Sequence, residues 1–470
     1  MKKAWEIAGE LYWNAKPVVL SEEDQTWTAN LETQKFYDQI LSLDWESHVP
    51  GSGAPERIMV AAVQALENRG YQAGARAYEL LEAGIRAHGA GDYVKLHEIS
   101  AELRYELSRA SKDPESPYWE YTQYTSFEQH EKAVEFPEKE PVDIHVPGFR
   151  DRLQAAWLSQ LIGAAMGTMV EGYTSQNLYE AFGEVQGYLR EPNTYNDDIT
   201  YELAFLDAFS RYGYEVTSKE IALSWAGLVP CGWSAEEIAL RNIKSGILPP
   251  ESGTFHNPFC EWIGAQMKGG ICGMVAPGDT HLAAKLAWAD GEVAHAGNGI
   301  LGEVFNAVLT ALAFTEPDIR VLLRQGIDLI PKDSEYYSVV SFAWECCERY
   351  EDWHQALSDC QERYKKYNWI HAYPNACCEV IALYYGNGDY EKTLHIVTMC
   401  GVDADCNAGM IMPILAIQQG MCIIPEKLIH PAFHELVTYM RGMCRCTLDE
   451  LVDDTLNSIK HAKNKEESLI

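Results

Sequence analysis

The sequence predicts an all-α protein, an irregular bundle of many helices. From Arg150 almost to the C-terminus, apolar residues recur at helical spacing. Alternating strand patterns are nearly absent from this region. The segment DRLQAAWLSQLIGAAMG combines apolar with small residues, as a helix packed closely on all sides would. These features together favour a helical bundle over any sheet-based architecture.

Composition limits the class of protein. The 470 residues exceed what one compact domain usually needs, and 47% are apolar. No stretch approaches the ~18 apolar residues of a membrane span, and MKKAWEIAGELYWN does not resemble a signal peptide. The net charge of −32, from 37 basic and 69 acidic residues, would repel nucleic acid and anionic lipid. We therefore expect a soluble, cytoplasmic protein with neither nucleic-acid nor membrane partners.

The cysteines indicate no metal module. Thirteen of them are scattered along the chain, without the two-pair spacing of a zinc site. We expect free, mostly buried thiols in a reducing compartment.

The N-terminal third has a different organisation. Three amphipathic segments separated by glycines predict three helices within residues 55–110. Residues 111–148 contain SKDPESPYW and EFPEKEPVDIHVPG, which are charged and rich in proline and predict an extended linker over the surface. We therefore expect a helical N-terminal extension with its linker over residues 1–148 and a second domain over residues 149–470.

Two pairs of aspartates each precede a long apolar segment. Asp197 and Asp198 open NDDITYELAFLDAF, and Asp403 and Asp405 open VDADCNAGMIMPILAI, in which Pro413 is expected near the helix start. Helix capping is one explanation, because acids at a helix N-terminus accept bonds from free backbone N–H groups. The other explanation is a metal site: if the two helix ends converge, four carboxylates repel one another unless cations intervene. Oxygen ligands favour Mg²⁺, with Mn²⁺ or Ca²⁺ possible.

Two further segments contain candidate functional residues. Glu171 follows a small-residue helix in GAAMGTMVEGY and is either an exposed loop residue or a catalytic carboxylate. HAGNGILGEVF places Gly297 and Gly299 at the start of a helix, where backbone N–H groups can contact a substrate phosphate. No apolar strand precedes these glycines, so a dinucleotide fold is not indicated. His295 is either a packed histidine or a substrate contact.

Five segments together resemble the ADP-ribosylglycohydrolase family. They are GAAMGTMVEG, NDDITYELAFLDAF, NPFCEWIGAQMKGG, HAGNGILGE and GVDADCNAG, and the likeness runs from about residue 150 to 450. The resemblance implies an orthogonal multi-helix fold with two Mg²⁺ ions in a central cleft. It implies that the four aspartates are metal ligands and that Glu171 is a carboxylate beside the metals and the scissile bond. Asn257 and His295 match segments that line the substrate side.

The chain departs from the family at two positions of the implied metal site. Asn196 stands where the family usually has threonine, and Cys406 stands where it has threonine or serine. An amide oxygen can replace a hydroxyl on Mg²⁺, but a neutral thiol is a poor ligand for a hard cation. The second ion is therefore expected to be less firmly held than the first.

The resemblance implies a Mg²⁺-dependent hydrolase that cleaves an N- or O-glycosidic bond to ADP-ribose or a related ribosyl compound. The expected partner is a small-molecule or ADP-ribosylated substrate. Two alternatives remain open at this point. One is hydrolysis of a small nucleoside-like or other glycoside, which a cleft walled off by the N-terminal extension would favour. The other is a non-catalytic binding or structural protein.

Overall fold

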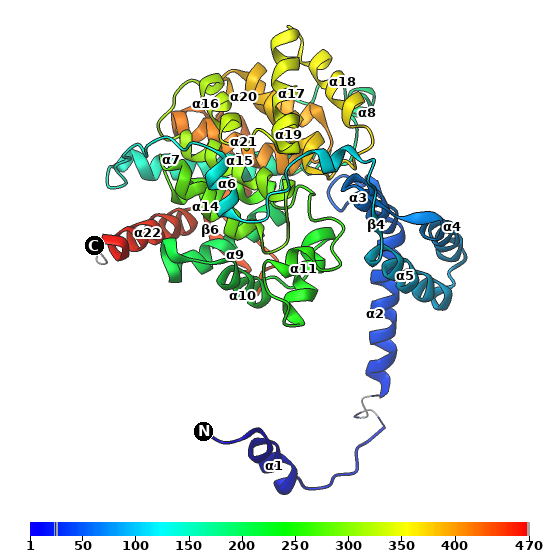
Figure 1. The fold of residues 1–470 in the computed structure, drawn as a ribbon. Coiled ribbons are helices and arrows are strands. Elements are labelled where there is room, and N and C mark those ends of the chain that lie inside the picture. The colour runs from blue at the N-terminus through cyan, green and yellow to red at the C-terminus, as the bar shows by residue number, and fades with distance from the viewer. Residues whose placement is uncertain (23, 25–26, 468–470) are drawn as a thin grey trace.

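The computed structural model describes residues 1–22, 24 and 27–467 (Figure 1). The predicted all-α class is confirmed, since the described residues form helices and only three short two-stranded sheets. The strands pair antiparallel: β1 (Ser47–His48) with β2 (Pro55–Glu56), β3 (Tyr71–Gln72) with β4 (Ser111–Lys112), and β5 (Glu435–Val437) with β6 (Arg445–Thr447). None of the described helices has the length and apolar character needed to cross a bilayer.

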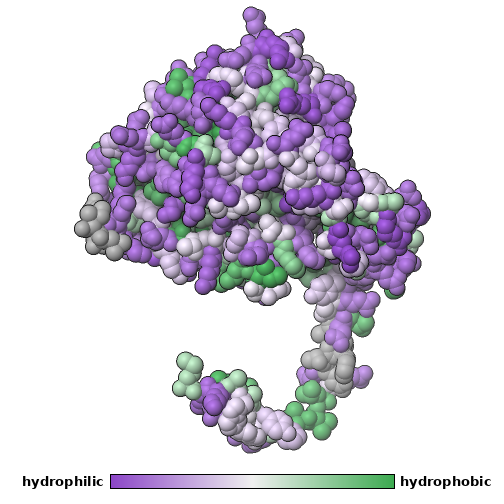
Figure 2. All heavy atoms as spheres, viewed as in Figure 1, coloured by the Kyte–Doolittle hydropathy of each residue, from purple (hydrophilic) through white to green (hydrophobic). Residues whose placement is uncertain are grey.

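The N-terminal helices are α1 (Ala4–Asn14), α2 (Trp27–Trp45), α3 (Ile58–Asn68), α4 (Gly74–Ala90), α5 (Tyr93–Ser108) and α6 (Phe127–Ala133). The three helices predicted within residues 55–110 are confirmed as α3, α4 and α5. They form a small group at one side of the molecule, whereas α1 stands apart from the main body (Figures 1 and 2).

The predicted linker is only partly extended. It contains the short helix α6 and a turn of 3₁₀ helix, η1 (Pro117–Glu120), which the proline content concealed. Tyr118, Tyr124 and His130 are buried, so these parts of the linker pack into the protein and do not merely lie across its surface. The next helix begins at Pro147, where proline at the first helical position is well tolerated.

The remaining helices form the main body. They are α7 (Pro147–Gly167), α8 (Ser175–Phe182), α9 (Asp197–Tyr212), α10 (Ser218–Leu228), α11 (Ser234–Lys244), α12 (Glu251–Thr254), α13 (Gly269–Val275), α14 (Thr280–Gly291), α15 (Asn298–Leu312), α16 (Ile319–Asp328), α17 (Glu335–Arg349), α18 (Trp353–Tyr364), α19 (Ala372–Gly386), α20 (Tyr390–Cys400), α21 (Ala404–Gln419) and α22 (Leu448–Glu467). Short 3₁₀ turns connect them: η2 (Gly213–Glu215), η3 (Gln266–Lys268), η4 (Met421–Ile423), η5 (Glu426–Leu428) and η6 (Pro431–His434).

Helices α7 and α21 pack together more extensively than any other pair of described elements. A Cβ atom added to Gly163 would lie 2.5 Å from the Ala408 carbonyl oxygen, and one added to Gly167 would lie 2.1 Å from the Asp405 nitrogen. These distances are far below van der Waals contact, so the two glycines allow the backbones to touch. The end of α7 is thereby fixed against the start of α21.

The structure adjusts one expectation and confirms another. Pro413 lies in the middle of α21 and not near its start, because the helix already begins at Ala404. All thirteen cysteines are free and most are buried, as predicted.

The glycine contact in α7 predicts a specific sensitivity. Gly163→Ala should lower the free energy of unfolding by about 1–3 kcal/mol, because backbone atoms of α21 must move to admit the methyl group. Gly148→Ala is the matched control, since Gly148 lies in the same helix with open space around its Cα. Urea unfolding of both variants measures the difference, and equal midpoints would contradict the close contact.

Candidate functional site

The two aspartate pairs converge. Ligand atoms of Asp197, Asp198 and Asp405 all lie within 4.8 Å of one another, and so do those of Asp403, Asp405 and Cys406. Asp405 therefore belongs to both groups. The sequence left open whether the two pairs meet. In the structure they do, at the N-terminal ends of α9 and α21.

Capping does not explain Asp198. Both of its carboxylate oxygens are buried without a hydrogen-bond partner, although it lies in the first turn of α9. Asn196 is the residue before this helix, and its side chain makes no capping bond either. Asp197 is different, because backbone N–H groups at positions 197 and 198 partly offset the rise of its pKa. Helix capping thus explains part of the interactions of the Asp197 carboxylate and none of those of the Asp198 carboxylate.

The environment of the cluster disfavours the charged form of its carboxyl groups. Burial and the neighbouring Asp197 raise the pKa of Asp198 well above its ordinary value. Burial and Asp405 do the same for the pKa of Asp403, and they raise the pKa of Asp197 to about 6. No Lys or Arg side chain in the described part of the chain forms an ion pair with these acids. The cluster lacks a positive partner.

Glu171 lies directly beside this cluster. Burial, followed by the charges of Asp405 and Asp403, raises the pKa of Glu171 well above its usual value. Its carboxyl group approaches Asp405 closely enough for a hydrogen bond, and the residue is 9% exposed. Of the two alternatives for Glu171, an exposed loop residue is therefore excluded.

Short backbone pairing holds Glu171 next to the second aspartate pair. The N–H of Gly172 donates to the Val402 carbonyl at 2.8 Å, and the Val402 N–H donates to the Tyr173 carbonyl at 2.9 Å. Val402 has φ of +52°, a conformation that a β-branched residue rarely adopts. Backbone strain of this kind, directly before Asp403, is typical of functional sites.

Two residues around the cluster were not anticipated from sequence. The Thr168 hydroxyl, directly after α7, lies 2.7 Å from the Ala164 carbonyl oxygen and 3.3 Å from Asp405 Oδ2, so its one proton has two possible acceptors. The Asn375 side-chain oxygen accepts the backbone N–H of Asp403 at 3.1 Å. A lone threonine after a small-residue helix and an asparagine inside α19 carry no distinctive sequence signal, so only the fold identifies them.

The ligand set fits a divalent cation on the chemistry of its atoms. Oxygen atoms without a hydrogen-bond partner are found on Asn196, Asp198, Asp403 and Asp405. The Asn196 amide nitrogen donates to Asp405 Oδ2 at 3.3 Å, which leaves its oxygen free. Cys406 is less suited, because burial and Asp198 raise the pKa of its thiol well above the usual value and keep it neutral.

Three of the predicted substrate contacts have structural partners instead. The Asn257 amide donates to the carbonyls of Ala235 and Ala294, so its side chain is occupied. A Cβ at Gly297 would lie 2.7 Å from Glu261 Oε1, and one at Gly299 would lie 2.4 Å from the Cys260 carbonyl.

The predicted phosphate contact at the start of α15 is also filled by protein. Glu261 Oε1 accepts the Asn298 N–H at 3.2 Å. Glu261 therefore occupies part of this helix start, and the assignment of Gly297 and Gly299 to substrate binding stays a prediction.

His295 keeps its potential as a contact. It is buried, and neither ring nitrogen has a hydrogen-bond partner. Its Nε2 lies 3.5 Å from Glu236 Oε1. Burial lowers the pKa of His295 well below its ordinary value and raises that of Glu236 to about 8, so a neutral pair results. The charge of Asp197 contributes to the shift at Glu236, which places this pair within electrostatic range of the cluster.

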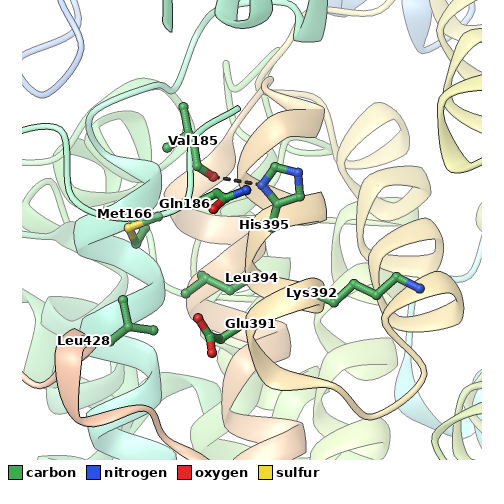
Figure 3. A pocket seen from close by; sticks show the side chains of 8 residues that line it. All are labelled: Met166, Val185, Gln186, Glu391, Lys392, Leu394, His395 and Leu428. Carbon is green, nitrogen blue, oxygen red and sulfur yellow. Dashed lines mark hydrogen bonds between the residues drawn. The ribbon is translucent and has the colours of Figure 1, made fainter. Parts of the chain in front are cut away.

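A separate hollow in the protein is shown in Figure 3. It is lined by Met166, Val185, Gln186, Glu391, Lys392, Leu394, His395 and Leu428. His395 Nδ1 is hydrogen-bonded to the Val185 carbonyl oxygen at 2.8 Å. None of the lining residues belongs to the carboxylate cluster. This hollow offers no chemistry comparable to that of the acids.

Comparisons with known proteins identify the family of the chain. The family model described as ADP-ribosylglycohydrolase matches residues 145–465. No protein with a curated description matches the chain. Among solved structures, an ADP-ribosylglycohydrolase-related protein complex is 16% identical, with a TM-score of 0.48, covering 67% of this chain and 99% of that one. The family match spans every residue of the cluster, and the chain belongs to the ADP-ribosylglycohydrolase family.

Proposed function

We propose that the protein is a Mg²⁺-dependent hydrolase that cleaves an N- or O-glycosidic bond to ADP-ribose or a related ribosyl compound. The observation that carries this proposal is the convergence, beside Glu171, of four aspartates, three of which have buried oxygens without a hydrogen-bond partner. A non-catalytic role is disfavoured, because a binding or structural protein has no need to retain this costly concentration of negative charge.

The four aspartates and the Asn196 oxygen would hold the metal ions. When bound, Mg²⁺ supplies Lewis-acid stabilisation of the ribose hydroxyls and of water. Mn²⁺ would suit the same oxygen ligands.

Glu171 would act as the general base. Its carboxylate would accept a proton from the attacking water while the water oxygen forms a bond to ribose C1 and the bond from C1 to the leaving group breaks. The Thr168 hydroxyl would stay within 3.3 Å of Asp405 Oδ2, with the Ala164 carbonyl as its nearer acceptor.

A substrate screen tests the proposal directly. ADP-ribosylated arginine and serine, nucleotides and free ribosides would be incubated with the protein, with and without Mg²⁺. We expect release of a ribosyl product from at least one of them only when Mg²⁺ is present. The absence of any Mg²⁺-dependent product would refute the proposal.

Asp198→Asn separates metal binding from capping. Removal of one buried charge from the cluster should stabilise the metal-free protein by roughly 1 kcal/mol or more and abolish the rise in Tm that Mg²⁺ produces. Asp92→Asn is the control, because Asp92 is a true cap of α5 that accepts the Lys95 N–H at 3.0 Å. Asn caps about as well as Asp, so this variant should leave both quantities unchanged. Thermal melts against Mg²⁺ concentration decide, and a full Mg²⁺ response from the Asp198 variant would favour capping.

Glu171→Gln should have the opposite pattern. We expect it to keep the Mg²⁺-induced rise in Tm but to lose a factor of ~10² to 10⁴ in kcat, because the amide cannot accept the proton. Glu180→Gln, on the exposed surface of α8, is the matched control and should retain normal turnover. Turnover by the Glu171 variant at the wild-type rate would assign the base to another residue.

Cys406→Ser tests the departure from the family pattern. A hydroxyl oxygen is a better ligand for a hard cation than a neutral thiol. The Mg²⁺ concentration at half-saturation should therefore fall by roughly threefold or more. The exposed Cys422→Ser variant controls for loss of a thiol elsewhere. Titration calorimetry with Mg²⁺ measures both, and unchanged affinity would mean that residue 406 lies outside the ligand set.

A further inference from the structure

The N-terminal extension reaches the carboxylate cluster through one hairpin. Its strands β1 and β2 are joined by residues 49–54, which we call the hairpin loop. The loop is closed by the Val49 N–H to the Ala54 carbonyl at 2.9 Å and by the Gly53 N–H to the Val49 carbonyl at 2.8 Å. A Cβ atom added to Gly51 would lie 2.2 Å from Thr168 Cγ2 and 2.9 Å from Glu171 Oε1. The backbone of the loop therefore lies directly on the proposed base and on its neighbour.

The hairpin loop is anchored on the segment that carries Glu171. The Tyr173 hydroxyl donates to the Ser52 carbonyl at 3.4 Å. A Cβ at Gly172 would lie 2.5 Å from the Ala54 side chain, so these backbones are also in close contact. At the end of the hairpin, the Trp233 indole N–H donates to the buried Glu56 carboxylate at 2.9 Å.

More distant contacts hold the rest of the extension in place. The buried Tyr118 hydroxyl donates to Glu261 Oε1 at 2.8 Å, and the Gln64 amide donates to the Lys366 carbonyl at 2.8 Å. Polar contacts at several separate points fix the extension as a wall of the site, not as a loosely attached domain.

The members of the cluster differ in their exposure to solvent. Asp197 is solvent-exposed, whereas Asp198 is fully buried and Glu171 lies beneath the hairpin loop. Whatever is joined to ribose C1 must lie within a few ångströms of the base, so the loop limits the size of that group. A polypeptide would have to continue in two directions from its modified side chain and needs an open groove at this point.

We infer that the hairpin loop of residues 49–54 excludes ADP-ribosylated proteins and restricts this enzyme to small, freely diffusing ribosyl compounds. The inference rests on the proposed function and deepens it by naming the substrate class. The loop acts as a specificity-determining wall, and it takes no part in the bond-breaking step.

The test compares matched substrates that differ only in size. ADP-ribosylated arginine and serine would be supplied as free conjugates and as the same linkages on a folded protein, together with free nucleotides and ribosides. Released product would be quantified by mass spectrometry in the presence of Mg²⁺. We expect kcat/KM for the preferred small compound to exceed that for its protein-linked form by about tenfold or more, a typical effect of steric discrimination.

Two variants of the full chain displace the wall in different ways. In the first, residues 50–53 are replaced by Asn-Gly, which forms a two-residue hairpin turn between Val49 and Ala54. In the second, Gly51→Ala, the added methyl group meets backbone and side-chain atoms of Thr168 and must move the loop. Each should reduce the ratio of small to protein-linked turnover by about tenfold. Gly89→Ala is the matched control in the same extension, because Gly89 in α4 has open space around it.

The outcomes distinguish the inference from the function on which it depends. Equal wild-type turnover of free and protein-linked conjugates would overturn the inference and leave the hydrolase proposal intact. A size ratio that persists in both folded loop variants would also overturn it. Absence of Mg²⁺-dependent cleavage of every compound would refute the proposed function and this inference with it.

Discussion

Mutual repulsion among four converging aspartates, three of them buried, is the constraint around which this fold is built. Carboxylates so close together tend to move apart unless the backbone prevents it. Two features supply that restraint: the backbone contact of α7 with α21 at Gly163 and Gly167, and the paired segments around Gly172 and Val402. The unusual backbone conformation of Val402 fits this account, because strain persists only where surrounding contacts enforce it.

A second buried cluster shows how the same protein treats acids that need no external cation. Lys268 Nζ lies 2.8 Å from Asp290 Oδ2 and 2.7 Å from Glu303 Oε2, with all three side chains fully buried. The lysine neutralises much of the charge, as buried ion pairs require. The aspartates at the ends of α9 and α21 have no such lysine in the described part of the chain. The contrast within one fold supports a role for those aspartates toward a cation that comes from solution.

Local features of the fold could be predicted from sequence, and long-range ones could not. Helical periodicity predicted α3, α4 and α5, because spacing along the chain determines which face is apolar. The aspartate pairs were recognisable by their positions before apolar segments, but their convergence depends on how α9 and α21 are placed in space. The contact of Glu261 with the helix start at Gly297 could not be predicted for the same reason, since Glu261 is 36 or more residues away in the chain. Contacts of this kind leave no trace in local composition.

The same limitation decides what family membership can say about the substrate. The family match begins at residue 145 and includes the aspartates, Glu171 and Thr168. The hairpin loop lies almost one hundred residues before that point, yet Gly51 contacts both Thr168 and Glu171. Groups that would bind metal and move a proton thus come from the shared fold, whereas one wall of the site comes from outside it. Family membership alone therefore indicates the chemistry of this site, and the leaving group that it accepts must be sought in the extension.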